Sequence, residues 1–427
     1  MAGEWPVVLA AGIFVLVYGL IVTEKIHRAV AALAGGMAVL ASGLLTQEEA
    51  VHAIDFNTIG LLVGMMVIVG VTRRSGVFEF LAVWAARLAQ GEPFRILAGL
   101  AVLTAVASAF LDNVTTVLLV VPVTFSIVYE LGLNPVPFIV TEILASNIGG
   151  TATLIGDPPN IMIGSATKLT FLDFLINLAP VALVVFIVTL FFIWLIYRRE
   201  LVIEEHLKEK VKTFDAAAQI KDCRLMRRSL IVLGLTILGF FLHGLLNIET
   251  ASIALAGAVL LLFIAREEIE DVLLSVEWPT IFFFTGLFII VGALEKVGII
   301  EELARAALEL TKGRVLATGT LILWFSALAS SVVDNIPFVA AMIPLIQEIG
   351  HFGGIANLNP LWWSLALGAC LGGNGTIVGA AANVIVAGLA ERNGLTLSFI
   401  RFFKVAFPLM LVSILISWLY LLVFHFH

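Results

Sequence analysis

The sequence predicts an all-helical membrane protein with about ten transmembrane spans, built from two copies of one unit in inverted orientation. The first observation behind this fold class is the composition. Of the 427 residues, 61% are hydrophobic and 13% are charged, whereas soluble domains have about 45–50% apolar and about 25% charged residues. An apolar surplus of this size along the whole chain indicates contact with lipid rather than a larger soluble core.

The second observation is an internal repeat. Residues 55–122 align with the second half of the chain without a gap when 222 is added to each position, and an offset of 223 continues the alignment. The matched pairs include polar and helix-breaking residues: Gly64 and Gly286, Ser108 and Ser330, Asp112-Asn113 and Asp334-Asn335, Pro122 and Pro344, Gly149-Gly150 and Gly372-Gly373, Thr153 and Thr376, and Asn160 and Asn383. Chance sharing of apolar residues does not explain such matches, so the sequence predicts two structural repeats.

The individual elements follow from the apolar runs and the breaks between them. Two pairs of short apolar arms meet at the Asp-Asn pairs and predict re-entrant hairpins, and two apolar stretches rich in Gly, Pro and Asn predict broken helices. The predicted organisation is scaffold helices in 1–50, a first repeat in 51–197 with its hairpin at 94–130 and its broken helix at 136–166, a cytoplasmic loop in 198–228, scaffold helices in 229–272, and a second repeat in 273–427 with its hairpin at 314–350 and its broken helix at 360–391.

The distribution of Lys and Arg predicts the orientation in the membrane. The loop 198–228 is rich in both residues and is expected in the cytoplasm, because basic loops stay inside. Threading outward from this loop places both termini outside and gives the repeats opposite orientations, which is typical of transporters that alternate access around a midplane site. The segment 296–314 falls outside in this map, and we expect it to form an amphipathic interfacial helix with 76–90 as its inner counterpart.

Asp112 and Asp334 stand at the predicted hairpin tips, and each is followed by Asn. An ionised carboxylate near the bilayer midplane is costly, so it is expected to face a cavity, bind a cation or take up a proton. A carboxyl that gains and loses a proton can couple transport to a proton gradient, and the neighbouring amide can donate to and accept from a polar solute. The alternative is that each Asp only caps the second helix of its hairpin; the two roles are compatible.

The broken helices supply further candidates. Gly149-Gly150 and the segment around Asp157 cannot continue a regular helix, and the second repeat breaks near Gly373. Unwound backbone and half-helix ends present carbonyls, amides and dipoles to an ion or a solute; a kink that serves packing alone is the alternative. The predicted substrate- and ion-binding residues are Asp112, Asn113, Thr115, Asn147, Gly149, Gly150, Thr151, Asp157, Asn160, Asp334, Asn335, Cys370, Gly373, Asn374, Thr376 and Asn383.

Two of the candidates have equally simple alternatives. Glu142 lies one turn before the first break and is expected to join Asp112 and Asp334 in proton coupling, although pairing with a neighbour also explains it. Cys370 is either a contact for a thiophilic solute or a small core residue, because one thiol cannot form a multi-thiolate site. The other cysteine, Cys223, is far away in sequence, and we expect no disulfide, metal site or cofactor.

Three motifs carry a resemblance: Leu111-Asp112-Asn113-Val114-Thr115-Thr116, Ile155-Gly156-Asp157-Pro158-Pro159-Asn160, and Gly368-Ala369-Cys370-Leu371-Gly372-Gly373-Asn374-Gly375-Thr376. They resemble the ArsB/NhaD family of the ion-transporter superfamily, in its arsenite-permease-like and P-protein-like branch. The resemblance implies ten spans, two re-entrant hairpins and two broken helices around a central site. Related sodium-coupled dicarboxylate carriers have Ser-Asn-Thr at the tips; Asp at both tips departs from that pattern, because fixed carboxylates repel an anion and titratable Asp suits proton exchange.

The leading functional hypothesis is export of arsenite and antimonite in exchange for protons, by alternating access. Both solutes are mostly neutral trihydroxides at neutral pH, which Asn, Thr and backbone groups can bind. Sodium/proton antiport is the second hypothesis, and transport of organic anions such as dicarboxylates is the third. A passive channel and an intramembrane aspartyl protease are alternatives from other classes; neither Asp has the Gly-x-Gly-Asp setting of such proteases, and we expect no enzymatic activity.

The expected partners are the lipid bilayer, protons and a small inorganic solute, and the expected location is the bacterial inner membrane. A formal net charge of -7 is not typical of a protein that binds nucleic acid. A homodimer and a soluble ATPase partner, which some arsenite permeases have, are open alternatives.

Overall fold

The protein is described by a computed structural model that covers residues 5–23, 25–204, 207–208, 211 and 214–426. These residues form helices and connecting segments without a β-strand, which confirms the predicted all-α membrane fold. Within them, ten helices are long and apolar enough to span a membrane: α1 (Trp5–Thr23), α4 (Phe56–Arg74), α6 (Pro93–Phe110), α7 (Asn113–Glu130), α10 (Phe171–Tyr197), α12 (Cys223–Leu246), α15 (Trp278–Lys296), α17 (Val315–Val332), α18 (Asn335–Gly353) and α21 (Phe399–Phe424).

The other helical elements are shorter. They are α2 (Arg28–Ala41), α3 (Gln47–Ala53), α5 (Val77–Leu88), α8 (Pro135–Thr151), α9 (Pro158–Ala166), α13 (Thr250–Ala265), α14 (Ile269–Leu273), α16 (Ile299–Thr311), α19 (Asn359–Gly372), α20 (Ala381–Arg392) and the 3-10 turns η1 (Ala217–Gln219), η2 (Gly373–Gly375) and η3 (Ile377–Gly379). Parts of the predicted cytoplasmic loop, residues 205–206, 209–210 and 212–213, lie outside the described residues.

The helices of the two halves correspond one to one. Adding 222 to the bounds of α4 and α6 gives the bounds of α15 and α17. The same offset takes the first residues of α2 and α3 to the first residues of α13 and α14. The structural repeat therefore includes helices before residue 55, where the match between the two halves of the sequence begins.

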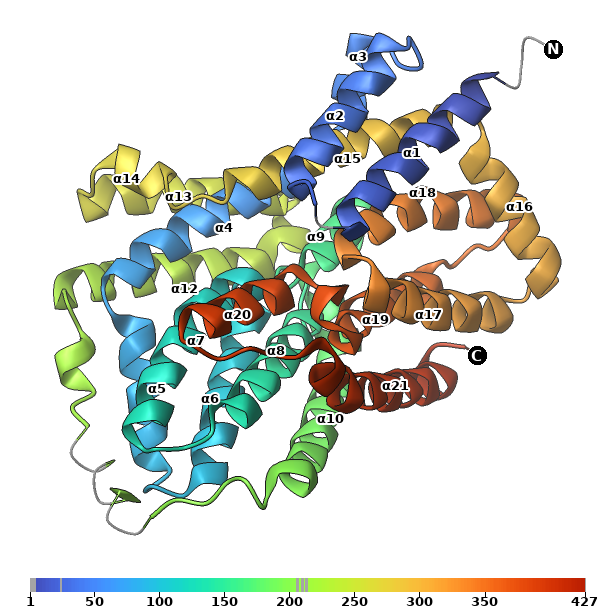
Figure 1. Ribbon diagram of the computed structural model, residues 1–427. Helices are drawn as coiled ribbons and strands as arrows, with labels where there is room; N and C mark the ends of the chain where they lie inside the picture. The colour runs from blue at the N-terminus through green and yellow to red at the C-terminus, as the bar shows by residue number, and fades with distance from the viewer. Residues whose placement is uncertain (1–4, 24, 205–206, 209–210, 212–213, 427) are drawn as a thin grey trace.

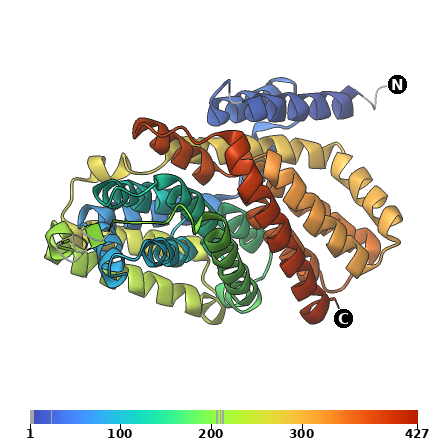
Figure 2. The same cartoon turned by 60° about the horizontal axis from the view of Figure 1, so that its bottom comes forward.

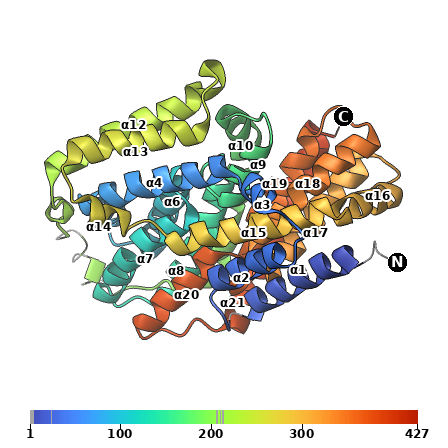
Figure 3. The same ribbon diagram turned by 90° about the horizontal axis from the view of Figure 1, so that it is seen from above.

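The two repeats exchange helices. α2 packs against α15 and α13 packs against α4, so each repeat supports a long helix of the other. Figure 3 shows α12 and α13 along one edge and α1 and α2 at the opposite edge, with α4 and α15 between them. In Figure 2 the two blue N-terminal helices form a layer on one side of the molecule. Such exchange is the arrangement expected of inverted repeats that face one another.

The broken helices lie between the two hairpins: in Figure 1, α6 and α7 lie to the left of α9 and α19, and α17 and α18 lie to the right. Hairpin 1 consists of α6 and α7, and hairpin 2 consists of α17 and α18; each arm has 18 or 19 residues. α8 packs against α6, α19 packs against α17, and α8 and α19 contact each other. The exchange continues here, because α9 contacts α18 and α20 contacts α7.

Two equivalent glycines permit the close helix crossings of the scaffold. A Cβ atom on Gly286 of α15 would lie 2.4 Å from the backbone of Ala32 in α2. A Cβ atom on Gly64 of α4 would lie 2.6 Å from the backbone of Ala254 in α13. Ala32 and Ala254 are themselves related by the offset of 222, so both crossings use the same pair of positions.

Replacing either glycine by alanine should therefore push two helices apart. We expect Gly64→Ala and Gly286→Ala each to cost about 1–3 kcal/mol, the usual range for overpacking a filled interface. Thermal unfolding of the purified protein in detergent measures this as a midpoint several degrees below that of the wild type. Gly12→Ala in α1 is the matched control, because no heavy atom lies within 4 Å of its Cβ position; an equal loss in the control would contradict the account.

Candidate functional site

The hairpin tips are built around the two aspartates. Each hairpin bends through one extended residue, Leu111 or Val333, and the following Asp caps the second arm. Asp112 accepts hydrogen bonds from the Thr115 backbone N–H at 2.8 Å and from the Thr115 hydroxyl. Asp334 accepts from the backbone N–H of Ile336 at 3.3 Å. Both residues thus cap helices, and each also lines a cavity at the hairpin tips.

Two equivalent asparagines hold the broken helices open. The Asn160 amide Nδ2 donates to the carbonyls of Gly150, Thr151 and Thr153, at 3.4, 3.2 and 2.8 Å. The Asn383 amide Nδ2 does the same in the second repeat, where it donates to the carbonyls of Gly373 and Thr376 at 2.7 and 2.9 Å. Carbonyls freed by an unwound helix in the membrane need such donors, so these two side chains stabilise the breaks.

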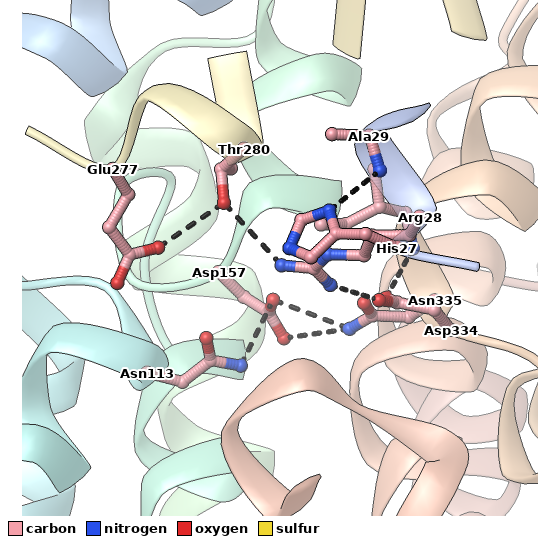
Figure 4. A network of polar contacts seen from close by, with 10 residues as sticks. His27, Arg28, Ala29, Asn113, Asp157, Glu277, Thr280, Asp334 and Asn335 are labelled. Atoms are coloured by element: carbon pink, nitrogen blue, oxygen red, sulfur yellow. Dashed lines mark hydrogen bonds and ion pairs between the residues drawn. The ribbon is translucent and has the colours of Figure 1, made fainter. Parts of the chain in front are cut away.

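Asp157 lies where the two tips meet (Figure 4). Its carboxylate accepts from the Nδ2 atom of Asn113 at 3.3 Å and from that of Asn335 at 3.3 Å. The side chain is fully buried. One carboxylate of the first repeat therefore receives hydrogen bonds from the tips of both hairpins, and it has no equivalent, because Ala380 occupies the matching position of the second repeat.

Asn147 extends this network into the second broken helix. Its Oδ1 accepts from Asn113 at 3.1 Å, and its Nδ2 donates to the Oδ1 atoms of Asn374 and Asn383 at 2.9 and 3.0 Å. The Cys370 thiol, at the position that matches Asn147, lies 3.5 Å from Asn160 Oδ1. The two breaks and the two tips thus form one continuous polar network inside the fold.

Arg28 brings a positive charge to the site. Its Nη1 atom lies 2.6 Å from Asp334 Oδ2, and its Nη2 atom donates to the Thr280 hydroxyl at 3.4 Å. The same hydroxyl donates to Glu277 at 3.2 Å, and Figure 4 shows these side chains beside Asp157 and the tip residues. Three carboxylates, from Asp112, Asp157 and Glu277, and the Arg28 guanidinium line one small central cavity. Asp334 lines the adjoining cavity, together with Arg28 and Glu277.

This central cavity has a volume of about 20 Å³, which is enough for about one water molecule. Two larger cavities share its walls. One of about 400 Å³ includes Arg28, Glu277 and Asp334, with mostly aliphatic residues opposite them. The other, of about 380 Å³, includes Glu277 and Thr115 together with Arg73, Arg74 and Lys221. Both lie beside segments that the charge map assigns to the cytoplasmic side.

Comparison with known proteins identifies the family of the chain. A family model described as "Citrate transporter" matches residues 18–368. The chain belongs to the citrate transporter family. Uncharacterized transporters of Mycobacterium bovis and Mycobacterium tuberculosis are each 43% identical to it over 419 residues, covering 97% of both proteins. It is an integral membrane protein, and the bacterial relatives place it in the plasma membrane.

Two further relatives bear on the predicted family branch and fold. The human P protein is 35% identical over 99% of this citrate transporter family member, which spans 60% of the P protein. The YdaH transporter of Alcanivorax borkumensis has the same fold, with a TM-score of 0.62, 15% identity and 98% coverage of both chains. The narrower assignment to the ArsB/NhaD family stays a prediction.

The structure separates the predicted site residues into groups. Asp112, Asn113, Asp157 and Asn335 line the central cavity of this family member, and Asp334 lines the adjoining cavity. Asn147, Asn160, Asn374, Asn383 and Cys370 join them through the amide network. The Thr115 hydroxyl donates to Asp112, and the hydroxyls of Thr151 and Thr376 donate to the carbonyls of Asn147 and Ser331. Gly149, Gly150 and Gly373 permit close backbone approach at the breaks.

Glu142 lies apart from this group. It is buried between α7 and α8, where its Oε1 accepts from the Thr124 hydroxyl at 2.5 Å. Its Oε2 has no hydrogen-bond partner among the described residues. Pairing with a neighbour, the alternative explanation of Glu142, therefore accounts for only one of its two carboxylate oxygens. Its role in proton coupling stays a prediction.

Sequence reasoning missed Arg28 and Glu277. The repeat offers a signal for Glu277, because the offset of 222 relates it to Asp55, and both stand at the N-cap position of a long helix. No such signal exists for Arg28, since its repeat equivalent is Thr250 and its neighbours in sequence are typical of a basic loop.

The role of the two structural asparagines leads to a test. Asn160→Ala and Asn383→Ala each remove one donor shared by several buried carbonyls, and we expect each to cost about 1–3 kcal/mol. Thermal unfolding in detergent measures the loss. Gln47→Ala, at an exposed position of α3, should stay within about 0.5 kcal/mol of the wild type. Wild-type stability of both buried variants would show that the breaks hold without these amides.

Proposed function

We propose that this protein is a proton-coupled secondary transporter that exports arsenite and antimonite in exchange for protons. The observation that carries the proposal is the position of Asp157, which accepts from the asparagines of both hairpin tips within a cluster of four carboxylates around the central and adjoining cavities. A motion of either tip changes the environment of this carboxylate. The cluster is therefore placed to link proton binding to movement of the hairpins.

The charge balance of the cluster supports proton coupling. Four carboxylates and one guanidinium line the central cavity and the adjoining cavity of about 400 Å³, and unpaired charges in a membrane interior are costly. Protons or a cation must therefore enter the cluster to balance it in some step of the cycle. A free anion is disfavoured at such a site unless protons accompany it.

The polar groups of the network suit a neutral hydroxylated solute. Asn113 and Asn335 turn their amide nitrogens to Asp157, and amide oxygens accept hydrogen bonds from hydroxyl groups. Arsenite and antimonite present three hydroxyl groups and no charge at neutral pH. The thiol of Cys370 adds one soft atom next to the network.

The exchange of helices between repeats supports alternating access. The cavities that adjoin the site lie at the starts of α2 and α15. At the equivalent place in the other repeat, the Ser165 hydroxyl donates to Asp55 at 2.8 Å, and Asn57 joins both Ser165 and the backbone of Ala251. We propose that this second cluster closes the outer side while the inner side is open, and that the two sides exchange during transport.

Sodium/proton antiport is the second candidate. The excess of carboxylates over basic groups around the cavity favours a cation as directly as it favours protons. Transport of organic anions is the third candidate, and it has support in the description of the family and in Arg28, which lines the cavity of about 400 Å³.

Uptake into everted vesicles with an imposed pH gradient tests the leading proposal. We expect wild-type protein to accumulate arsenite, and we expect Asp157→Asn to reduce the initial rate by about tenfold or more, a loss of about 1.4 kcal/mol or more in the barrier. Glu302→Gln, at an exposed position on α16, is the matched control and should transport normally.

The same vesicles separate the alternatives. A sodium-dependent change of the internal pH that arsenite does not alter would favour sodium/proton antiport instead. Uptake of citrate or a dicarboxylate, without arsenite uptake, would favour the third candidate. Full arsenite transport by Asp157→Asn would contradict the role given to the central carboxylate.

A further inference from the structure

Asp112 and Asp334 are equivalent by the repeat but have different surroundings. Both cap the second arm of a hairpin; Asp112 lines the central cavity, and Asp334 lines the adjoining cavity of about 400 Å³. In the conformation described here, however, only one of them forms an ion pair within the described part of the chain. Two carboxylates with equal positions in sequence can therefore have unequal roles.

Asp334 is held by a fixed positive charge. Arg28 lies 2.6 Å from it, and the guanidinium is itself positioned by Thr280 and by the ring of Phe283, whose centroid is 5.3 Å away. Arg28 belongs to α2 and the other two residues belong to α15, so the pair connects hairpin 2 to the scaffold. A buried carboxylate with such a partner keeps its charge, because losing the charge would leave the guanidinium uncompensated.

Asp112 has a different set of neighbours. Its hydrogen bonds come from Thr115, in its own helix. Arg28 is bound to Asp334, and the position equivalent to Arg28 is Thr250, which cannot supply a charge. Asp157 accepts hydrogen bonds from two amides, and Glu277 is a further carboxylate in the cavity that Asp112 lines. The charged groups that share the central cavity with Asp112 are Asp157, Glu277 and Arg28, and Asp334 lines the adjoining cavity.

A path for protons to Asp112 is also present. Thr115, which binds both oxygens of the Asp112 carboxylate, lines the cavity of about 380 Å³. The charged residues of that cavity are Arg73, Arg74, Glu79, Lys221 and Glu277. A cavity of this size has room for water, and its lining extends from Arg73, Arg74 and Lys221 to Thr115 in the first turn of α7. Such water would let a proton reach the Asp112 carboxylate through the Thr115 hydroxyl and return.

We propose that Asp112 is the carboxyl that exchanges the coupling proton, whereas Asp334 stays ionised and latches hairpin 2 to the scaffold through Arg28. The inference rests on the proton coupling proposed above and adds a division of labour between the two repeats. It applies whichever solute is transported, since it concerns the proton and the latch alone.

Infrared difference spectroscopy of the purified protein in lipid tests whether Asp112 exchanges the proton. Acidification of the wild type should produce a carbonyl band of a protonated carboxyl group. We expect Asp112→Asn to lose this band and Asp334→Asn to keep it, and Asp112→Glu to restore a band at a shifted frequency. Size-exclusion chromatography of each variant confirms that it is folded.

The outcomes are distinct. Loss of the band in Asp334→Asn, or its full retention in Asp112→Asn, would overturn the inference and leave proton coupling intact. A wild type without any such band would overturn both the inference and the proposed function. Loss in Asp112→Asn alone supports both.

A double-mutant cycle tests the latch. Arg28→Gln leaves the Asp334 carboxylate without its partner, so its thermal midpoint should fall clearly below that of the wild type. Arg28→Lys should recover part of the loss, and Arg28→Gln/Asp334→Asn should unfold at a higher temperature than Arg28→Gln alone. Arg305→Gln, which breaks the exposed pair with Glu301, is the control and should change little. Additive losses in the double variant would overturn the latch.

Discussion

The fold is organised around the cost of carboxylates inside a membrane. Each acidic group at the centre needs a proton, a cation or a set of hydrogen-bond donors, and the chain meets this need in different ways. Asp157 receives amides from both hairpin tips, and Asp334 receives the guanidinium of Arg28. These partners come from different helices and different repeats. The carboxylates therefore keep their hydrogen bonds and their ion pair only while those helices hold their relative positions. A change in the protonation of one carboxylate therefore alters the contacts that hold the helices together.

The exchanged packing of the repeats provides two scaffold contacts, between which the hairpins and broken helices can move. α2 with α15 and α13 with α4 form two equivalent scaffold contacts, while the hairpins and broken helices meet between them. Backbone groups at the breaks are satisfied internally by Asn160 and Asn383, so the central unit can change its neighbours without exposing unpaired carbonyls to lipid. Two equivalent sets of contacts, one on each side, are the physical basis of alternating access.

Much of this arrangement could be predicted from the sequence. The repeat is visible because Asp, Asn, Gly and Pro recur at a fixed offset, and the fold places hairpins and breaks where these residues interrupt the apolar runs. The contacts that break the symmetry could not be predicted. The sequence around Arg28 is typical of a basic loop and does not predict an ion pair. The shared role of Asp157 depends on the approach of Asn113 and Asn335 in space, which no local sequence pattern predicts.

The most direct test of the account measures whether hairpin 1 moves against the scaffold when the cluster changes charge. Spin labels at Met37 of α2 and Val106 of α6, both exposed, can be introduced after Cys223→Ser, because Cys370 is buried. The account predicts two populations of label distances in lipid, with a ratio that changes with pH in the wild type and does not change in Asp112→Asn. A single distance that is independent of pH in the wild type would contradict it.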